Sequence, residues 1–167
     1  MGNAGEPLSP LCRWYIYALH GYLAEIGFTA TCNLLAHWDW RLLGVASVWV
    51  LFIYGTFGMI LEHLYLRLRC RCNLVVRGFL YTLCIYAWEF CIGYILRCFN
   101  ACPWDYSGYR HNFMGLITLE YCPLWFVGSL LLERVVVHTL RLRLDETWEP
   151  KEYPSPNSEQ KRLWKEE

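Results

Sequence analysis

The sequence predicts an all-α membrane protein with four transmembrane helices, built as two parallel two-helix repeats. Two observations support this prediction: long apolar runs separated by short charged stretches, and a residue pattern that recurs after 64 positions. The 167-residue chain is 56% hydrophobic, and its nine Trp and twelve Tyr gather near the ends of the apolar runs. Such aromatic belts are typical of membrane interfaces. The net charge of zero gives no indication of nucleic-acid binding.

Four runs are long enough to cross a bilayer, which requires roughly 20 mostly apolar residues. They are residues 14–35, 44–65, 74–96 and 113–138. Pro123 is expected to kink the fourth helix. The runs define a transmembrane domain of residues 13–143. A cytoplasmic segment of residues 1–12 precedes it, and a Pro-, Glu- and Lys-rich tail of residues 144–167, expected to be disordered and cytoplasmic, follows it.

The distribution of arginine orients the helices. Between the second and third runs lie Arg67, Arg69, Arg71 and Arg77, and further basic residues follow the fourth run. The two other connections hold fewer basic residues, each accompanied by an aspartate. Because loops rich in Arg and Lys stay in the cytoplasm, both termini of this multi-pass protein are expected there.

The repeat is clearest in the first helix of each pair. Its two copies are Arg13-x-Tyr15-Ile16-Tyr17-x-Leu19-x-x-Tyr22-x-x-Glu25 and Arg77-x-Phe79-Leu80-Tyr81-x-Leu83-x-x-Tyr86-x-x-Glu89. The second helices end alike, in Leu66-Arg67-Leu68-Arg69 and Leu140-Arg141-Leu142-Arg143. Equivalent helices are separated by an even number of spans, so the two copies are expected to have the same orientation, related by an axis along the membrane normal.

Glu25 and Glu89 are the leading candidates for a functional site. Each lies 12 residues after an arginine, which is about 18 Å along a helix and near the middle of the bilayer core. Tyr22 and Tyr86 share their helix faces by i, i+3 spacing. If the two faces meet, one carboxyl group is expected to carry a proton at neutral pH. The pair then forms a proton or cation site or contacts a polar substrate; alternatively, each acid bonds a Tyr hydroxyl and joins helices.

The remaining intramembrane polar residues are weaker candidates. Glu62 and Glu133 are expected to lie at the interface and to pair locally with Arg67 and Arg134. Two others could join the polar site, namely His20 as a ligand or proton relay and Glu120 beside the broken helix at Pro123. A histidine satisfied within the bundle is the structural alternative for His20.

The outer loop after the third run is dense in turn-forming and aromatic residues. Asp105 is expected to form an Asx-type turn with the backbone of Ser107, while Trp104 and Tyr106 lie at the interface. Asn112 follows in the same connection. The loop either caps the bundle as an ordered structure or acts as a gate or recognition loop over a cavity.

The nine cysteines give no indication of a metal site, because no Cys/His spacing suits zinc. Cys70 and Cys72 flank Arg71 next to the membrane and are candidates for palmitoylation. The nucleotide-binding motif Gly-x-x-x-x-Gly-Lys-Ser/Thr is absent, as are Ser-His-Asp and metalloprotease patterns. We therefore expect neither a cofactor nor an enzymatic activity.

Several segments resemble the transmembrane protein 229 family, most closely its B form. They are Arg13-Trp14-Tyr15, His20-Gly21-Tyr22, Ser47-Val48-Trp49, Leu51-Phe52-Ile53-Tyr54-Gly55-Thr56, Tyr65-Leu66-Arg67-Leu68-Arg69, residues 99–107, and Phe113-Met114-Gly115-Leu116-Ile117-Thr118-Leu119-Glu120-Tyr121. That family is in turn similar to bacterial CmpB-type proteins, described as ABC-transporter components. The similarity to the CmpB type lies mainly in Trp104-Asp105-Tyr106-Ser107, Asn112 and Gly115. The resemblance implies a multi-pass membrane protein and assigns no catalytic residue.

These observations favour a transport-related membrane component with an intramembrane carboxylate site. The alternative is a non-transporting adaptor, regulator or assembly factor whose acids only join helices. Four spans in 167 residues enclose little volume. A transporter of this size therefore needs a second copy of itself or another membrane partner, in addition to the surrounding lipids.

Overall fold

The computed structural model describes residues 5–144 of the chain. Contacts divide the chain into a helical unit, Pro7–Leu142, and a second unit formed by its two ends. The short strands β1 (Glu6–Pro7) and β4 (Arg143–Leu144) pair in a two-stranded sheet. Apart from Leu144, the tail that the sequence predicts to be disordered lies outside the described residues.

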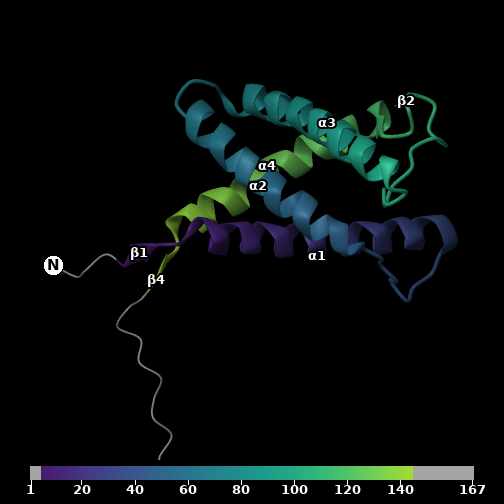
Figure 1. The fold of residues 1–167 in the computed structure, drawn as a ribbon, viewed down its shortest axis with the longest axis horizontal. Helices are drawn as coiled ribbons and strands as arrows, with labels where there is room; N and C mark the ends of the chain where they lie inside the picture. Colours follow the sequence, from purple (N-terminus) through teal and green to yellow (C-terminus); the bar gives the residue numbers. More distant parts are fainter. Residues whose placement is uncertain (1–4, 145–167) are drawn as a thin grey trace, which may run out of the picture. The chain divides into compact units, whose positions relative to one another are not determined.

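Four α-helices form the helical unit (Figure 1). They are α1 (Pro10–His37), α2 (Val48–Leu68), α3 (Leu74–Cys98) and α4 (Cys122–Arg141). The side chain of Ser9 caps α1 by accepting from the Cys12 amide, and that of Asn73 caps α3 in the same way, 64 residues later. Because Ser9 is the N-cap and Pro10 suits the first helical turn, α1 begins four residues before the start predicted at residue 14.

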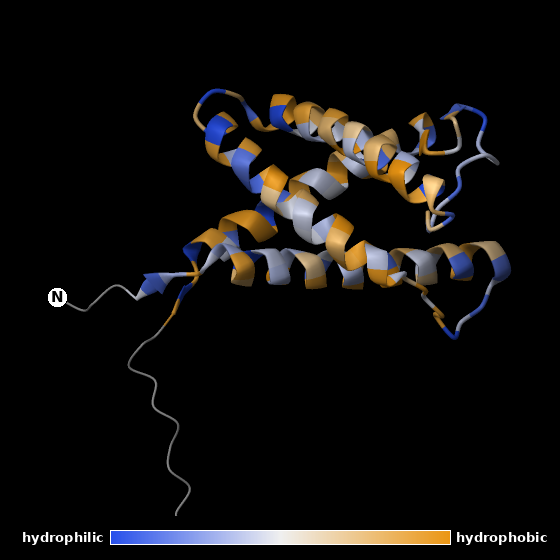
Figure 2. Ribbon diagram, viewed as in Figure 1, coloured by the Kyte–Doolittle hydropathy of each residue, from blue (hydrophilic) through white to orange (hydrophobic). Residues whose placement is uncertain are grey.

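Three of the described helical segments are long and apolar enough to cross a bilayer. They are α2, α3 and Leu119–Arg141, which contains α4. In Figure 2 these segments are coloured mainly orange to white, with a few blue, hydrophilic residues along them. α1 is the longest helix, but polar residues such as His20, Glu25 and Asn33 interrupt its apolar run. That α1 forms a fourth span therefore stays a prediction.

The segment before α4 corrects the prediction of a helix over residues 113–138. The strands β2 (Asn112–Phe113) and β3 (Ile117–Thr118) form an antiparallel hairpin, and a 3₁₀ turn, η1 (Leu119–Tyr121), leads into α4. Pro123 lies in the first turn of α4, where its missing N–H has no helical partner to lose. The expected kink at Pro123 was therefore wrong, because the proline starts the helix and does not interrupt it.

All four helices contribute to one buried core. α1 packs chiefly against α2, and α3 chiefly against α4. The buried residues of the core are Tyr17, Phe57, Leu61, Tyr81 and Val136. A Cβ atom at Gly58 would lie 2.5 Å from the Cβ of Tyr17, so the close approach of α1 and α2 requires glycine there. Tyr17 and Tyr81, which are equivalent in the sequence repeat, thus belong to the same core.

Candidate functional site

Glu62 on α2 is held by an arginine and a tyrosine from α1. Its side chain is almost fully buried. The Arg13 guanidinium donates from Nε to Oε2 and from Nη2 to Oε1, both at 3.0 Å, and the Tyr17 hydroxyl donates to Oε2 at 2.6 Å. Arg13 Nη1 also donates to the carbonyl of Leu8 at 2.6 Å. The bidentate pair neutralises a charge that would be costly to bury alone.

The same arrangement recurs between α3 and α4 around Glu133. Arg77 donates from Nε to Oε2 at 2.9 Å and from Nη2 to Oε1 at 2.7 Å, while the Tyr81 hydroxyl donates to Oε2 at 2.8 Å. Arg77 Nη1 donates to the carbonyl of Cys72, five residues earlier, as Arg13 does to Leu8. The two arrangements, hereafter the arginine clasps, use the same residue types in the same roles.

The clasps correct the prediction that Glu62 and Glu133 pair with Arg67 and Arg134 on their own helices. In both cases the partner arginine comes from the preceding helix, 49 or 56 residues away. The repeat already contained both arginines and both tyrosines. It did not show which acid they bind, because that depends on how the helices pack.

Glu25 and Glu89 have partners of a different kind. The Tyr54 hydroxyl donates to Oε2 of Glu25 at 3.0 Å, and the Tyr106 hydroxyl donates to Oε1 of Glu89 at 3.3 Å. Within the part of the chain that the structure describes, Glu89 Oε2 is buried without a hydrogen bond. The indole of Trp125 is close to Glu89, yet its Nε1 makes no hydrogen bond of good geometry.

No cation compensates these two acids among the described residues. Every ion pair found there involves other carboxylates. Glu25 and Glu89 lie close enough to each other to interact electrostatically, and Tyr54 interacts with both. The structure therefore brings them into one neighbourhood, hereafter the carboxylate pair, with no hydrogen bond between them.

The sequence did not single out Tyr54 and Trp125 as neighbours of the carboxylate pair. Tyr54 on α2 bonds Glu25, and Trp125 on α4 approaches Glu89. The two positions differ by 125 − 54 = 71, the same offset that relates Glu62 to Glu133 (133 − 62 = 71). Aligning the second helices on their acids would have found this pair.

Three of the predicted site residues do not join the carboxylate pair. The Tyr86 hydroxyl donates to the carbonyl of Thr118 at 2.9 Å. His20 is exposed, with Nδ1 bonded to the Ile16 carbonyl of its own helix at 2.8 Å. Glu120 is exposed in η1, where it accepts from the amide of His111 at 2.9 Å and from the Thr118 hydroxyl. Glu120 thus stabilises the hairpin.

Tyr22 is half-buried on α1, and no hydrogen bond to Glu25 is found for it among the described residues. The i, i+3 spacing placed Tyr22 and Glu25 on one face. The hydroxyl that reaches Glu25 comes from the neighbouring helix instead.

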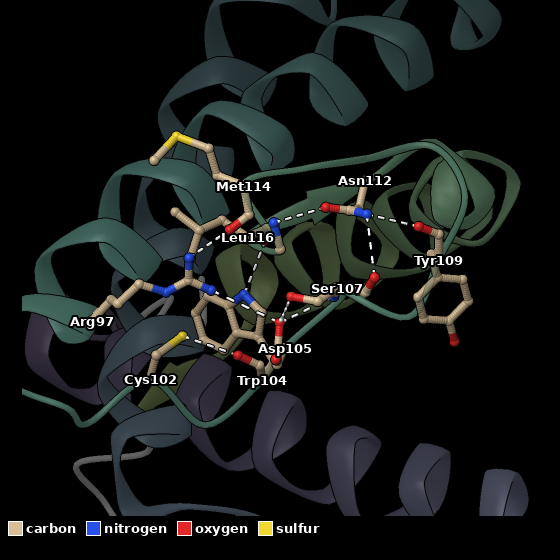
Figure 3. Close-up of polar contacts among 10 residues, drawn as sticks. Arg97, Cys102, Trp104, Asp105, Ser107, Tyr109, Asn112, Met114 and Leu116 are labelled. Carbon is tan, nitrogen blue, oxygen red and sulfur yellow. Dashed lines mark hydrogen bonds and ion pairs between the residues drawn. The ribbon is translucent and has the colours of Figure 1, made fainter.

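The outer loop forms the Asx-type turn that the sequence predicts (Figure 3). Asp105 Oδ1 accepts from the Ser107 amide at 3.0 Å and from the Ser107 hydroxyl at 2.5 Å. Arg97, at the end of α3, donates to the carbonyl of Met114 at 2.5 Å and lies 3.9 Å from Asp105. The bonds from Ser107, with a smaller effect from Arg97, lower the pKa of Asp105 below its ordinary value.

The loop motif holds the β2–β3 hairpin in place. The Trp104 indole donates to the carbonyl of Leu116 at 3.0 Å (Figure 3). The Tyr106 amide donates to the carbonyl of Gly115 at 2.8 Å. Asn112 Oδ1 accepts from the Gly115 amide at 2.9 Å. Gly115 has a φ of 65°, and a Cβ there would lie 2.5 Å from Ser107 Oγ, so the turn requires glycine.

One residue of this motif reaches the carboxylate pair. Tyr106 extends from the loop so that its hydroxyl donates to Glu89. Burial, followed by the charge of Glu89, raises the pKa of Tyr106 well above its ordinary value, so the phenol remains a hydrogen-bond donor. The loop is therefore linked directly to the acid at the middle of α3.

The palmitoylation candidates lie in the connection between α2 and α3. Cys70 is an exposed free thiol, whereas Cys72 is half-buried and its carbonyl accepts from Arg77. Their modification stays a prediction. Among the described residues, no group of three His, Cys, Asp or Glu side chains is placed to hold a metal ion.

Three apolar helices of sufficient length, with acidic side chains buried between them, define a helical membrane protein. A family model described as "Putative ABC-transporter type IV" matches residues 12–150, most of the chain. The protein therefore belongs to this CmpB-type family, which confirms that part of the sequence resemblance. No solved structure matches the chain.

Proposed function

We propose that the protein is a transport-related, multi-pass membrane component in which the carboxylate pair binds a proton or another cation. One observation carries the proposal. Glu62 and Glu133 each bind an arginine, whereas Glu25 and Glu89 have no cationic partner among the described residues. The chain therefore neutralises Glu62 and Glu133 with its own arginines. Glu25 and Glu89 are left for a proton or another cation to neutralise.

A carboxylate between helices in a medium of low dielectric constant is costly unless it is neutralised. For the carboxylate pair, a proton or a bound cation would do this. Tyr54 and Tyr106 would orient the acids, because each donates one hydrogen bond to a carboxylate oxygen. Glu89 Oε2 remains available to a ligand.

The proposal includes α1 as a fourth span and both termini in the cytoplasm. The two arginine clasps support an origin from two parallel copies of one hairpin, because Arg, Tyr and Glu have the same roles in both. The resemblance to the transmembrane protein 229 family is consistent with a multi-pass protein.

The proposal also requires partners. A small helical unit encloses little volume, so we expect a homodimer or another membrane protein to complete a transport path. Because the nucleotide-binding motif is absent, any ATP hydrolysis would come from such a partner. We assign no enzymatic activity and no cofactor to this chain.

The alternative is a membrane adaptor, regulator or assembly factor. The bonds from Tyr54 to Glu25 and from Tyr106 to Glu89 each join separate elements of the fold. Hydrogen bonds of this kind stabilise helix bundles without any transport role.

Reconstitution of the full chain into vesicles tests the two functions. We expect proton or cation flux, reported by an enclosed pH or ion dye, that Glu25→Gln and Glu89→Gln abolish while the protein remains folded. Glu120→Gln is the matched control, because Glu120 lies outside the carboxylate pair. Absence of flux from the wild type alone and with its copurifying partners, or flux unaffected by both pair variants, would support the adaptor.

A further inference from the structure

A groove lies between α1 and α4, away from the carboxylate pair. Its volume is about 310 Å³, and it is lined by Ile16, His20, Arg134, Val135, His138, Thr139 and Leu142. The lining combines aliphatic side chains with one guanidinium and two imidazoles. Such a combination matches an amphiphile with an anionic head and an apolar body.

Arg134 provides the positive charge of the groove. It is exposed, and no carboxylate among the described residues lies within ion-pair distance of it. Its acidic neighbour in the sequence, Glu133, has both oxygens bonded by Arg77 and Tyr81. Arg134 acts on Glu133 only through its charge and forms no ion pair among the described residues, so its guanidinium can bind a ligand in the groove.

The two imidazoles have fixed orientations. Nδ1 of His20 lies 2.8 Å from the Ile16 carbonyl, and Nδ1 of His138 lies 2.8 Å from the Arg134 carbonyl. Each ring is therefore anchored to its own helix, and Nε2 is the ring nitrogen left to bond a polar atom of a ligand.

The groove lies at the end of α4 that is expected to face the cytoplasm. Arg134 precedes Arg141, the last residue of the helix, by 141 − 134 = 7 residues. That is about 10 Å along the helix, a depth from which an arginine side chain reaches the headgroup region. Basic pockets between helices on this side of a membrane are suited to anionic lipid headgroups.

We propose that this groove binds an anionic phospholipid of the cytoplasmic leaflet, with Arg134 contacting the phosphate and the aliphatic side chains contacting the upper acyl chains. The charge of Arg134 selects an anionic headgroup, and the apolar lining selects a lipid over free phosphate. This site rests on the topology given in the proposed function, but it does not require the carboxylate pair to bind a cation.

The test compares phosphatidylserine with phosphatidylcholine of the same acyl chains, binding to the full chain in mild detergent, by native mass spectrometry. We expect phosphatidylserine to bind about fivefold tighter, the effect of one basic contact worth about 1 kcal/mol. Arg134→Gln should remove the preference, and the exposed loop variant Arg110→Gln should retain it. Inorganic phosphate should not compete.

Three results would overturn the proposal: no preference for phosphatidylserine in the wild type, the same preference in Arg134→Gln as in Arg110→Gln, or competition by inorganic phosphate. If Arg134→Gln does not fold, wild-type protein and a photo-crosslinkable phosphatidylserine replace it. Labelling within residues 16–20 or 134–142 supports the site, and labelling only elsewhere overturns it.

Discussion

The arginine clasps and the carboxylate pair place the same side chain, glutamate, in two different electrostatic settings. In the clasps, Glu62 and Glu133 each accept two bonds from a guanidinium and one from a tyrosine. In the pair, Glu25 and Glu89 accept from a tyrosine alone. The clasp acids are thus neutralised by arginine. Glu25 and Glu89, each 12 residues beyond a clasp arginine on α1 or α3, are not.

Under the proposed function, this difference separates a structural role of the clasps from a ligand-binding role of the carboxylate pair. A buried ion pair with all its oxygens bonded has little capacity to exchange a ligand, since removing either partner leaves an uncompensated charge. An acid held by a neutral hydroxyl can exchange a proton or a cation without breaking the fold. The predictions below test this distinction, in order of decreasing effect.

The largest effect is expected from breaking a clasp. Arg77→Ala leaves Glu133 buried without its cation and should lower the free energy of unfolding by about 3–5 kcal/mol. Arg41→Ala is the control, because the Arg41 side chain is largely exposed and its ion pair with Asp39 should contribute little to stability. Denaturant unfolding in detergent measures both. Similar losses from the two variants would show that the clasp has no special role.

A substitution series at the two kinds of glutamate gives the next largest contrast. Glu89→Gln should fold normally, because Gln keeps the shape and the acceptor for Tyr106. Glu89→Leu should cost about 1–3 kcal/mol, since it leaves the Tyr106 hydroxyl without its acceptor. Glu133→Gln should lower the stability more than Glu89→Gln does, because Arg77 then loses its counter-charge. Equal stability of the two Gln variants would remove the distinction.

A smaller effect is expected from the link between the loop and the carboxylate pair. Tyr106→Phe removes one donor to Glu89 and should cost about 0.5–1.5 kcal/mol. Tyr94→Phe on the exposed surface of α3 is the control and should be neutral. Thermal unfolding compares them, and a neutral Tyr106→Phe would mean that the loop does not support Glu89.

The smallest effect concerns the pH dependence of the loop. The pKa of Asp105 is lowered, so its turn is stabilised above the ordinary value of about 3.8 and loses this contribution as the pH falls through the lowered pKa. The amide signal of Ser107 in an NMR titration should therefore stay constant at neutral pH and shift only in acid. Asp105→Asn should abolish the shift, and a midpoint above 3.8 would contradict the account.

The sequence was informative about helices and much less so about partners. Hydropathy located α2 and α3 closely, because their apolar runs coincide with the helices. It misplaced the start of α4, because the apolar residues 113–121 belong to a hairpin and a 3₁₀ turn whose geometry depends on Gly115 and the loop bonds. Local pattern alone does not show such tertiary contacts.

The candidate site shows the same limit. The repeat identified Glu25 and Glu89 from their equal distance to an arginine. It placed Tyr22 and Tyr86 on the helix faces of these acids and did not name the tyrosines that bond them, which are Tyr54 and Tyr106 from other elements. Spacing along one helix defines a face of that helix. Which residues of other elements contact that face depends on how the helices pack.

Infrared spectroscopy of the full chain in lipid, at neutral pH and without metal cations, tests the central claim most directly. An acid lacking a cationic partner should be protonated there and should show the carbonyl stretch of a neutral carboxyl group. We predict this band in the wild type and in Tyr94→Phe, and its loss in the double variant Glu25→Gln, Glu89→Gln. Absence of the band from the wild type, or its persistence in the double variant, would contradict the distinction between the arginine clasps and the carboxylate pair.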